Sequence, residues 1–546
     1  RGHMSDSSAS GSQSSSTETN KKVSSQVGSP YARYVLGVLV VVYIFNFIDR
    51  QILSILAEDI KADLGISDAD IGFLYGTAFA IFYAVFGIPL GRLADTWTRK
   101  SLISTGLLFW SVMTALSGTA RSFASLATFR IGVGIGEASA TPAAFSMLSD
   151  YFEPKHRATA LAVYSSGVYI GSGIGIFLGG VILDGWLTLY PDYTAAPMQL
   201  KGWHVAFFAV GLPGVLLAAW VATLKEPLRG LSEGIKTIQH PHPFKETWKE
   251  LKSLLPILNL HSLWNNGAGI RGIIINLIGL AVICGISTLL IQITGSTTQW
   301  IALSIGVYAA FCWSQNLAYA DHAAFAMIFG SKTILLACLA FPSVAFVTYG
   351  IGFWGPPFFQ RIHGVSAAET GIVLGLATAI GGWAGVTLGG VLADTFRSKY
   401  VRAKFYVSAA AAFASIPPGY IMLTTDSLNV AYACNFVFSF TSPMWIGPAA
   451  STVNDLVMPR MRAIASAFYI LMVTFIGLAL GPYVIGFISD ELVQSGTKSP
   501  DALRQAMMIG LYMLAFAGSM MLIASRFLEK DENSRIDRAI ALGENV

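Results

Sequence analysis

Four ionisable residues lie inside long apolar stretches of the first half of the chain. Asp49 and Arg50 interrupt one stretch, and Arg130 and Glu137 occupy another. The spacing of seven residues between Arg130 and Glu137 corresponds to two helical turns, so their opposite charges share one stripe. Charge within such an apolar helix is costly and usually functional. If the two helices adjoin, we expect these four side chains to neutralise one another in crossed pairs.

The types of these residues predict proton coupling and anion binding. A carboxylate in apolar surroundings holds its proton more tightly, whereas a neighbouring arginine favours the charged form. Asp49 and Glu137 are therefore predicted to carry protons, and Arg50 and Arg130 to bind an anionic substrate group. The alternative is a static ion-pair network that stabilises the helices. The apolar stretches of the second half are almost free of charge, and pure stabilisation would not require this asymmetry.

The second half offers aromatic and amide side chains where the first half offers charge. Tyr349, Phe353 and Trp354 lie near the end of one apolar stretch, and Asn435 and Trp445 lie within another. Aromatic residues at helix ends usually anchor or pack the helix. In the absence of charge they also suit the apolar wall of a cavity, and we predict that these five residues contact substrate. A cavity charged on one side and aromatic on the other suits an amphipathic molecule.

Two charged motifs occur twice. The segment 91–100 is echoed by 390–397, and Asp150 with Arg157 is echoed by Asp455 with Arg462, 305 residues later. A duplicated bundle with charged loop motifs on one side is typical of an alternating-access transporter. The alternative is that these loop charges only orient the chain. The predicted cytoplasmic gate, closed by pairing across the halves, comprises Asp95, Arg99, Lys100, Asp150, Arg157, Asp394, Asp455 and Arg462.

Composition places the chain in a membrane. Hydrophobic residues make up 54% of the sequence and charged residues only 12%, against roughly 25% in soluble domains. A membrane helix needs about 20 mostly apolar residues, and fourteen stretches qualify. They are 34–56, 71–90, 102–120, 126–148, 158–183, 205–224, 272–293, 300–320, 333–351, 371–393, 405–423, 430–452, 464–488 and 507–527.

These stretches predict an all-α integral membrane protein with two six-helix bundles related by pseudo-two-fold symmetry, and an inserted two-helix hairpin. The expected segments are a disordered cytoplasmic tail over 1–30 that starts with a four-residue cloning remnant, bundles over 31–226 and 332–530, a linker with the hairpin over 227–331, and a tail over 531–546. Basic residues collect in the loops of one side, so both termini are expected in the cytoplasm and the chain in the cell membrane. In the fifth span Gly171, Gly175, Gly179 and Gly180 predict close approach of a neighbouring helix.

At these residues the chain resembles the major facilitator superfamily. The segment 91–100 resembles its signature loop between helices two and three, with Thr98 where glycine is usual, and Arg130 matches the arginine of its helix-four motif. Residues 171–180 resemble the antiporter motif, with Ile176 at the position of a proline. Residues 46–50, 68–72 and 130–138 are similar to the spinster-like lysolipid transporters. The resemblance implies export of lysophospholipids or sphingosine-1-phosphate, with Arg50 and Arg130 facing the headgroup.

The leading hypothesis is a secondary active transporter of an amphipathic or organic anion, coupled to protons. One alternative is a proton-coupled exporter of organic cations or drugs, and another is a membrane receptor or sensor without transport. An enzyme is not indicated, because no nucleophile and base stand together and the histidines lack metal-ligand spacing. We expect a monomer in the lipid bilayer with no cofactor, no metal and no nucleic-acid partner.

Overall fold

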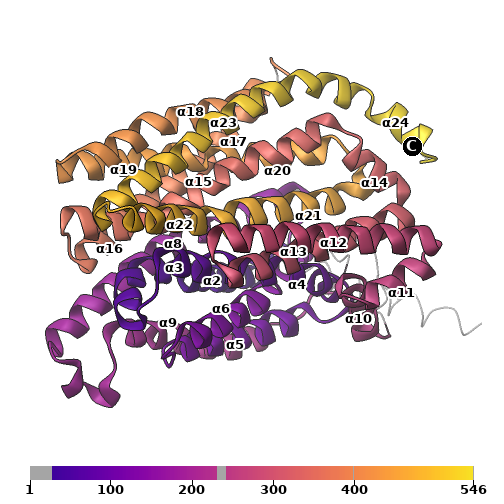
Figure 1. Ribbon diagram of the computed structural model, residues 1–546. Helices are drawn as coiled ribbons and strands as arrows, with labels where there is room; N and C mark the ends of the chain where they lie inside the picture. The colour runs from indigo at the N-terminus through magenta and orange to yellow at the C-terminus, as the bar shows by residue number, and fades with distance from the viewer. Residues whose placement is uncertain (1–26, 230–240, 398, 545–546) are drawn as a thin grey trace, which may run out of the picture.

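The computed structural model describes residues 27–229, 241–397 and 399–544, and it is built of helices that form two bundles (Figure 1). Most of the predicted N-terminal tail and residues 230–240 of the predicted linker lie outside this part of the chain. The first bundle comprises α2 (Pro30–Leu64), α3 (Asp68–Tyr75), α4 (Thr77–Thr96), α5 (Arg99–Ser117), α6 (Phe123–Glu137), α7 (Ala140–Tyr151), α8 (Pro154–Leu189) and α9 (Gly202–Ala222).

The remaining helices form an insertion and a second bundle. The insertion contains α10 (Pro243–Leu254), α11 (Leu258–Asn265), α12 (Gly269–Thr294), α13 (Thr297–Ala320) and α14 (His322–Phe329). The second bundle contains α15 (Lys332–His363), α16 (Ala367–Leu376), η4 (Ala377–Gly382), α17 (Trp383–Arg397), α18 (Ala403–Thr424), α19 (Leu428–Thr441), η5 (Ser442–Trp445), α20 (Ile446–Asp455), η6 (Pro459–Met461), α21 (Arg462–Met472), η7 (Val473–Ala479), α22 (Leu480–Gln494), α23 (Ser499–Asn533) and α24 (Arg535–Ala541).

Local chemistry explains where the first long helix begins and ends. The Ser29 side chain accepts a hydrogen bond from the main-chain N–H of Ala32, and Pro30 occupies the first helical position, where no N–H is needed. The helix ends at Gly65, whose φ of 62° is the left-handed conformation that glycine adopts without strain. The resulting helix of 35 residues exceeds the length needed to span a bilayer.

Helices occupy all fourteen predicted spans. Eleven helical segments among the described residues are long and apolar enough to cross a membrane. The predicted spans 126–148 and 430–452 are not among the eleven, because each is divided into shorter helices, the first between α6 and α7 and the second at η5. The predicted span 102–120 is also not among the eleven, and it overlaps α5, a helix of 19 residues. The architecture of two bundles and a hairpin is confirmed, whereas the count of fourteen crossings stays a prediction.

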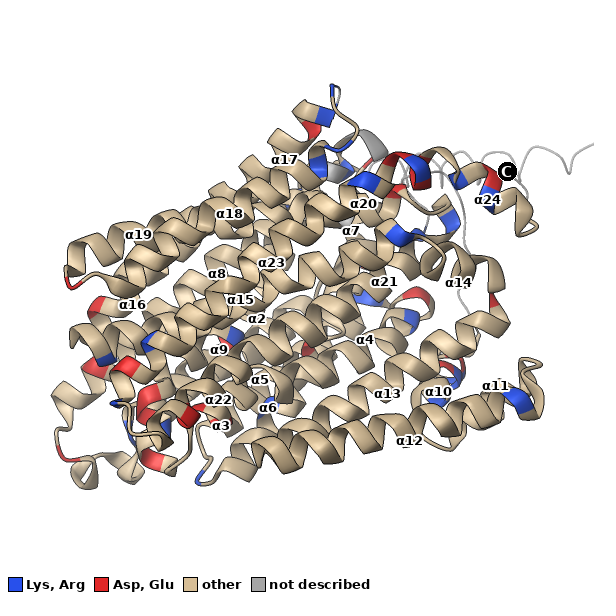
Figure 2. Cartoon of the chain, turned by 45° about the horizontal axis from the view of Figure 1, so that its top comes forward, with Lys and Arg blue, Asp and Glu red and all other residues tan. Residues whose placement is uncertain are grey.

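The bundle has two charged ends with apolar helices between them (Figure 2). We call them the α2–α3 end, where the chain turns between Leu64 and Asp68, and the α4–α5 end, where it turns between Thr96 and Arg99. The α2–α3 end corresponds to the side predicted to face outward, and the α4–α5 end to the side predicted to face the cytoplasm.

Glycines bring the two bundles into contact. A Cβ atom at Gly72 of α3 would lie 2.6 Å from the main-chain oxygen of Pro482 in α22, and one at Gly180 of α8 would lie 2.2 Å from that of Ala367 in α16. Only glycine allows main chains to approach so closely. The predicted close approach in the fifth span is therefore present, but Gly171, Gly175 and Gly179 face α2 of the same bundle, and only Gly180 contacts the other one.

The inserted hairpin lies along the seam between the bundles (Figure 1). Gly306 of α13 packs on Ile81 of α4 and Phe475 of η7, so one helix of the hairpin contacts both bundles. The hairpin is held together by buried polar groups, since the amide of Asn276 donates to Gln315 and accepts from the hydroxyl of Tyr308, each at 2.8 Å. Such bonds fix the rotation of one helix against the other in apolar surroundings.

Candidate functional site

A buried ion pair joins the middle of α2 to the last residue of α6. The Nε of Arg50 donates to Oε2 of Glu137 at 2.6 Å. The Glu137 side chain is fully buried, while 12% of the Arg50 side chain is exposed. The other carboxylate oxygen of Glu137 has no hydrogen-bond partner among the described residues. The predicted pairing of the two helices is thus confirmed for Arg50 and Glu137, and Arg50 is the partly exposed member of the pair.

Aromatic rings surround the Arg50 guanidinium. Its central carbon lies 4.7 Å from the ring centre of Phe47, 4.5 Å from that of Phe79 and 4.6 Å from that of Tyr83. A guanidinium within about 6 Å of a ring face is attracted by the ring quadrupole, an attraction that strengthens when water is excluded. These contacts hold the charge of Arg50 in an apolar environment and do not consume its remaining hydrogen-bond donors.

The second crossed pair differs from the prediction. Arg130 is fully buried and its Nη1 donates to the main-chain oxygen of Asp49 at 3.1 Å, and no ion pair with the Asp49 carboxylate is present among the described residues. The carboxyl group of Asp49 turns instead toward Trp110 and Thr114 of α5. Arg130 Nε and Nη2 and Asp49 Oδ1 have no hydrogen-bond partner in the described part of the chain. The Arg130 guanidinium and the Asp49 carboxyl group therefore form no direct hydrogen bond or ion pair.

Of the five candidates of the second half, two lie near Arg50 or at a cavity, and the other three are held in packing contacts. Tyr349 lies within electrostatic range of Arg50, and Asn435 lines a small cavity of about 90 Å³. Phe353 stacks on Tyr75 of α3 with ring centres 4.4 Å apart, so it packs one bundle against the other. The last two are fixed by packing inside the second bundle, where the indole N–H of Trp354 donates to Pro482 at 2.8 Å and Trp445 stacks on Phe341.

A charged latch joins the bundles at the α2–α3 end. Arg361 of α15 donates to both carboxylate oxygens of Glu58 at 2.8 and 2.6 Å, and to both of Asp68 at 2.8 and 2.6 Å. Asp490 of α22 accepts from the main-chain N–H groups of Asp68 and Ala69 at 3.0 and 2.7 Å, which caps α3 from the opposite bundle. These contacts close this end of the molecule.

At the α4–α5 end the predicted gate residues of the first bundle pair with each other. The buried guanidinium of Arg99 forms an ion pair with Asp150 and a second one with Glu226, the latter at 2.9 Å. The main-chain N–H of Lys100 donates to the same Glu226 at 3.0 Å. Asp95 is exposed. The pairing across the halves that we expected here is thus replaced, for Arg99, by pairing within one bundle.

The second copy of the motif behaves in the same way. Asp455 binds Lys404 at 2.6 Å and lies 3.7 Å from Arg397, and all three residues belong to the second bundle. Of the other predicted gate residues, Asp394 and Arg462 are exposed and Arg157 is half-buried. The bundles are therefore fastened at the α2–α3 end, while these charged pairs at the α4–α5 end leave them separate.

Sequence reasoning missed two parts of this arrangement. The rings around Arg50 could have been sought, because Phe47 precedes it by three residues and Phe79 and Tyr83 are four residues apart on one helix face. The latch residue Arg361 gave no signal of its own, because a basic residue in the last turn of a helix is ordinary helix-end chemistry.

The chain is similar to known membrane transporters. The family sequence model of the Major Facilitator Superfamily matches residues 39–482. The chain belongs to this superfamily. An MFS-type efflux pump of Mycolicibacterium smegmatis is 26% identical over 484 residues, covering 89% of this chain and 90% of the relative. Protein spinster homolog 1 is 27% identical over 534 residues in Xenopus tropicalis, covering 92% and 83%, and 25% identical over 505 residues in Homo sapiens, covering 89% and 78%.

Solved structures identify this transporter as spinster-like. A bacterial homologue of the human lysosomal transporter spinster, in an inward-facing and unoccupied conformation, matches with a TM-score of 0.68 and 27% identity over 92% of this chain and 98% of that one. Its inward-facing and occupied form matches with a TM-score of 0.67 and 26% identity, over 92% and 99%. The transporter is therefore a membrane-transport protein and not an enzyme.

Proposed function

We propose that the transporter carries an amphipathic anion with a lysolipid-like shape by alternating access, and that a proton accompanies it. The observation that carries this proposal is the ion pair between Arg50 and Glu137. Arg50 is the less buried partner, and an anionic headgroup that bonds to its guanidinium competes directly with the Glu137 carboxylate. Binding of the anion then releases Glu137 from its cation.

Release of Glu137 couples the anion to a proton. A carboxylate buried away from water is strongly disfavoured in its charged form when no positive group neutralises it. Glu137 is fully buried, so it takes up a proton when Arg50 turns to the substrate. Anion and proton then occupy the same state of the transporter, which is the arrangement of cotransport. Asp49 is a second candidate carrier, because its carboxyl group is buried and forms no ion pair with a described residue.

The rest of the central region suits the apolar part of such a substrate. The cavity of about 90 Å³ beside Asn435 is lined by Tyr169, Ile351, Leu374 and Phe438, with hydroxyl groups at Thr348, Ser439 and Ser442. It lies between α8 of the first bundle and the second bundle. We propose that an acyl chain extends from the Arg50 region toward this cavity, and that opening of the α4–α5 end admits it.

The closed α2–α3 end supports alternating access. The latch around Arg361 joins the bundles on the predicted outer side, whereas the predicted gate residues on the other side pair within each bundle. A change to the opposite conformation requires the Arg361 latch to open and the predicted gate residues at the α4–α5 end to pair across the bundles. This orientation agrees with the proposed cytoplasmic position of both termini, which rests on the basic loops.

Export of an organic cation is the second candidate, and the name of the Mycolicibacterium smegmatis relative favours efflux. It requires carboxylates that a cation can reach. Asp49 and Glu137 are no more than 1% exposed, and the accessible charge is that of Arg50. The geometry therefore favours an anion.

Flux into proteoliposomes tests the proposal. We expect uptake of a labelled lysophospholipid to increase with an imposed pH gradient, to be lost in Arg50→Ala, and to lose its gradient dependence in Glu137→Gln. Arg33→Ala, which removes an exposed arginine of the same helix, is the matched control and should transport normally. Undiminished lysolipid flux in Arg50→Ala would reject the anion site. Gradient-driven flux in Glu137→Gln would remove Glu137 from coupling.

A further inference from the structure

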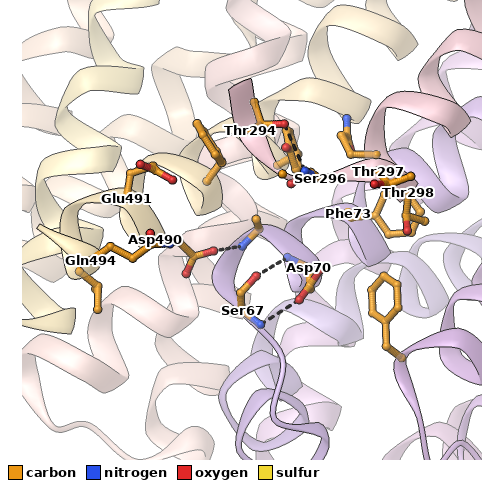
Figure 3. Close-up of a pocket in the computed structure, with 17 residues that line it drawn as sticks. Ser67, Asp70, Phe73, Thr294, Ser296, Thr297, Thr298, Asp490, Glu491 and Gln494 are labelled. Atoms are coloured by element: carbon orange, nitrogen blue, oxygen red, sulfur yellow. Dashed lines mark hydrogen bonds between the residues drawn. The ribbon is translucent and has the colours of Figure 1, made fainter. Parts of the chain in front are cut away.

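A cavity of about 520 Å³ lies at the α2–α3 end, away from the central charges. Its walls come from three parts of the chain, namely the first bundle, the turn of the inserted hairpin and one side of α22. Figure 3 places Asp490 and Glu491 on one side of it and Thr297 and Thr298 on the other. The volume falls within the range of about 300–1,000 Å³ that is typical of small-molecule sites.

The charged side chains of this cavity are all acidic. Asp70, Asp490 and Glu491 line it, and none of its lining residues is a lysine or arginine. Asp70 caps the start of α3 through the N–H of Ser67 at 3.1 Å, and Asp490 caps the same helix. Glu491 is exposed and has no ion pair with a described residue. The helix N-termini at the wall contribute about half a positive charge each, so the three carboxylates leave the cavity negative.

Aromatic rings form much of the remaining wall. Phe73 and Phe123 have ring centres 5.7 Å apart, and Tyr483 and Phe487 are stacked with centres 6.1 Å apart. The faces of such rings attract organic cations, and a cage of rings with carboxylates is how proteins recognise quaternary ammonium groups. A bare metal ion would leave most of this volume and its apolar surface without contact.

Gln299 is an independent sign that a ligand belongs here. Its side chain lines the cavity and is only 1% exposed, yet neither its amide nitrogen nor its oxygen has a hydrogen-bond partner among the described residues. Leaving a buried polar group without a hydrogen bond is destabilising. A buried amide without partners at the wall of an acidic cavity is explained by a polar ligand that the protein binds.

We propose that this cavity binds an organic ammonium ion with an apolar body. The carboxylate of Glu491 neutralises the charge and the rings contact the alkyl groups around it. The amide of Gln299, which is only 1% exposed without a ligand, turns toward the cavity and bonds to a polar substituent. The site is separate from the anion site at Arg50. Because its walls come from both bundles and from the hairpin, an occupant favours the arrangement in which the α2–α3 end is closed.

Saturation-transfer NMR on the purified full-length transporter in nonionic detergent tests this site. The probes are choline and 3,3-dimethylbutan-1-ol, which has the same shape and hydroxyl group but no charge. We expect choline to bind at least about fivefold more tightly than the neutral probe. Binding should weaken about threefold to fivefold in Glu491→Gln and by a similar factor in Phe487→Leu. Gln299→Leu, which keeps the volume but removes the amide, should also weaken binding.

The controls separate this site from the rest of the molecule. Asp426→Asn removes an exposed carboxylate in the loop between α18 and α19 that does not line the cavity, and choline binding should not change. Equal binding of the two probes, or equal weakening in Asp426→Asn and Glu491→Gln, would overturn the proposal. It would also be overturned by binding that is lost in Glu137→Gln but unchanged in Glu491→Gln, since that places the cation at the centre. Binding of Ca²⁺ without any binding of choline would replace the ammonium ion by a metal.

Discussion

Removal of the Arg361 side-chain charge should open the α2–α3 end. In Arg361→Met the four hydrogen bonds to Glu58 and Asp68 are lost, whereas Asp68 keeps its contacts with Lys61 and with the hydroxyl of Ser489. The Arg361 and Asp68 side chains are only 7% and 3% exposed, so solvent screening of this pair is weak. Breaking a buried pair costs about 3–5 kcal/mol.

The lower end of that range applies here, because Asp68 retains a positive partner. A loss of about 3 kcal/mol in the closed state corresponds to a change of about 150-fold in the balance between closed and open arrangements. The helices themselves stay intact, since Arg361 lies in the last turn of α15 and contacts the other bundle through its side chain only.

Cysteine labelling measures this change. Ser54→Cys places a thiol on α2 one turn before Glu58, at a position that is fully buried in the closed form. It is introduced after replacement of Cys284, Cys312, Cys338 and Cys434. A membrane-impermeant maleimide added on the outer side should label it about 100-fold faster in Arg361→Met than in the parent.

The control is Arg504→Met. Arg504 lies on the same end of the molecule, but it pairs weakly with Asp501 inside the second bundle. Its substitution should leave the labelling rate unchanged. An unchanged rate in Arg361→Met, or an equal increase in both variants, would refute the idea that this latch holds the bundles together.

Three further predictions concern the other contacts. Gly180→Ala places a Cβ 2.2 Å from the Ala367 oxygen, so it should separate α8 from α16 and raise the labelling rate of Ser54→Cys. Gly185→Ala on the same helix meets no atom within 4 Å and should leave that rate unchanged. Equal labelling in the two variants would reject this interface. Asp95→Asn removes a residue predicted to pair across the bundles only when the α4–α5 end closes, so cysteines at that end should label faster; unchanged labelling would limit Asp95 to orienting the chain. Hydrogen bonding to Arg460 lowers the pKa of Asp321, so the stability this pair adds is present above the unfolded pKa of about 4 and is lost as the pH falls through the native value. Arg460 is about half exposed, so Asp321→Asn should lower the unfolding free energy by less than about 1 kcal/mol at pH 7. This loss should disappear as the pH falls through the native pKa of Asp321, and a loss that is independent of pH would contradict the prediction.

The bundles and the central pair were predictable because apolar length and isolated charge leave few alternatives. A charge inside an apolar helix must find a partner, so Arg50 and Glu137 could be paired from sequence alone. Arg130 contacts Asp49 as predicted, but through the main chain of Asp49 and not through its carboxylate. Its guanidinium reaches the main-chain oxygen of Asp49, because the rotation of α2 turns that carboxyl group toward α5. Helix rotation depends on packing against several neighbours, which a pattern in one helix does not contain.

The pairing of Arg361 and the position of the hairpin could not be predicted from the sequence, for a different reason. Arg361, Glu58 and Asp68 lie at helix ends, where charges are common and most have no specific partner. Their pairing follows only from the contact of α15 with α2 and α3 across the bundles. The hairpin itself was predicted from its apolar length, but its place over α4 and η7 depends on side-chain packing such as that of Gly306 on Ile81 and Phe475.

The measurement that tests the central claim most directly is the number of protons bound with each substrate molecule. Titration calorimetry of the purified transporter with a lysophospholipid, in buffers of different ionisation enthalpy, gives this number. We predict uptake of about one proton per lysolipid in the parent protein, and none in Glu137→Gln with binding retained. Binding without proton uptake in the parent, or the same uptake in Glu137→Gln, would contradict the exchange of partners at Arg50.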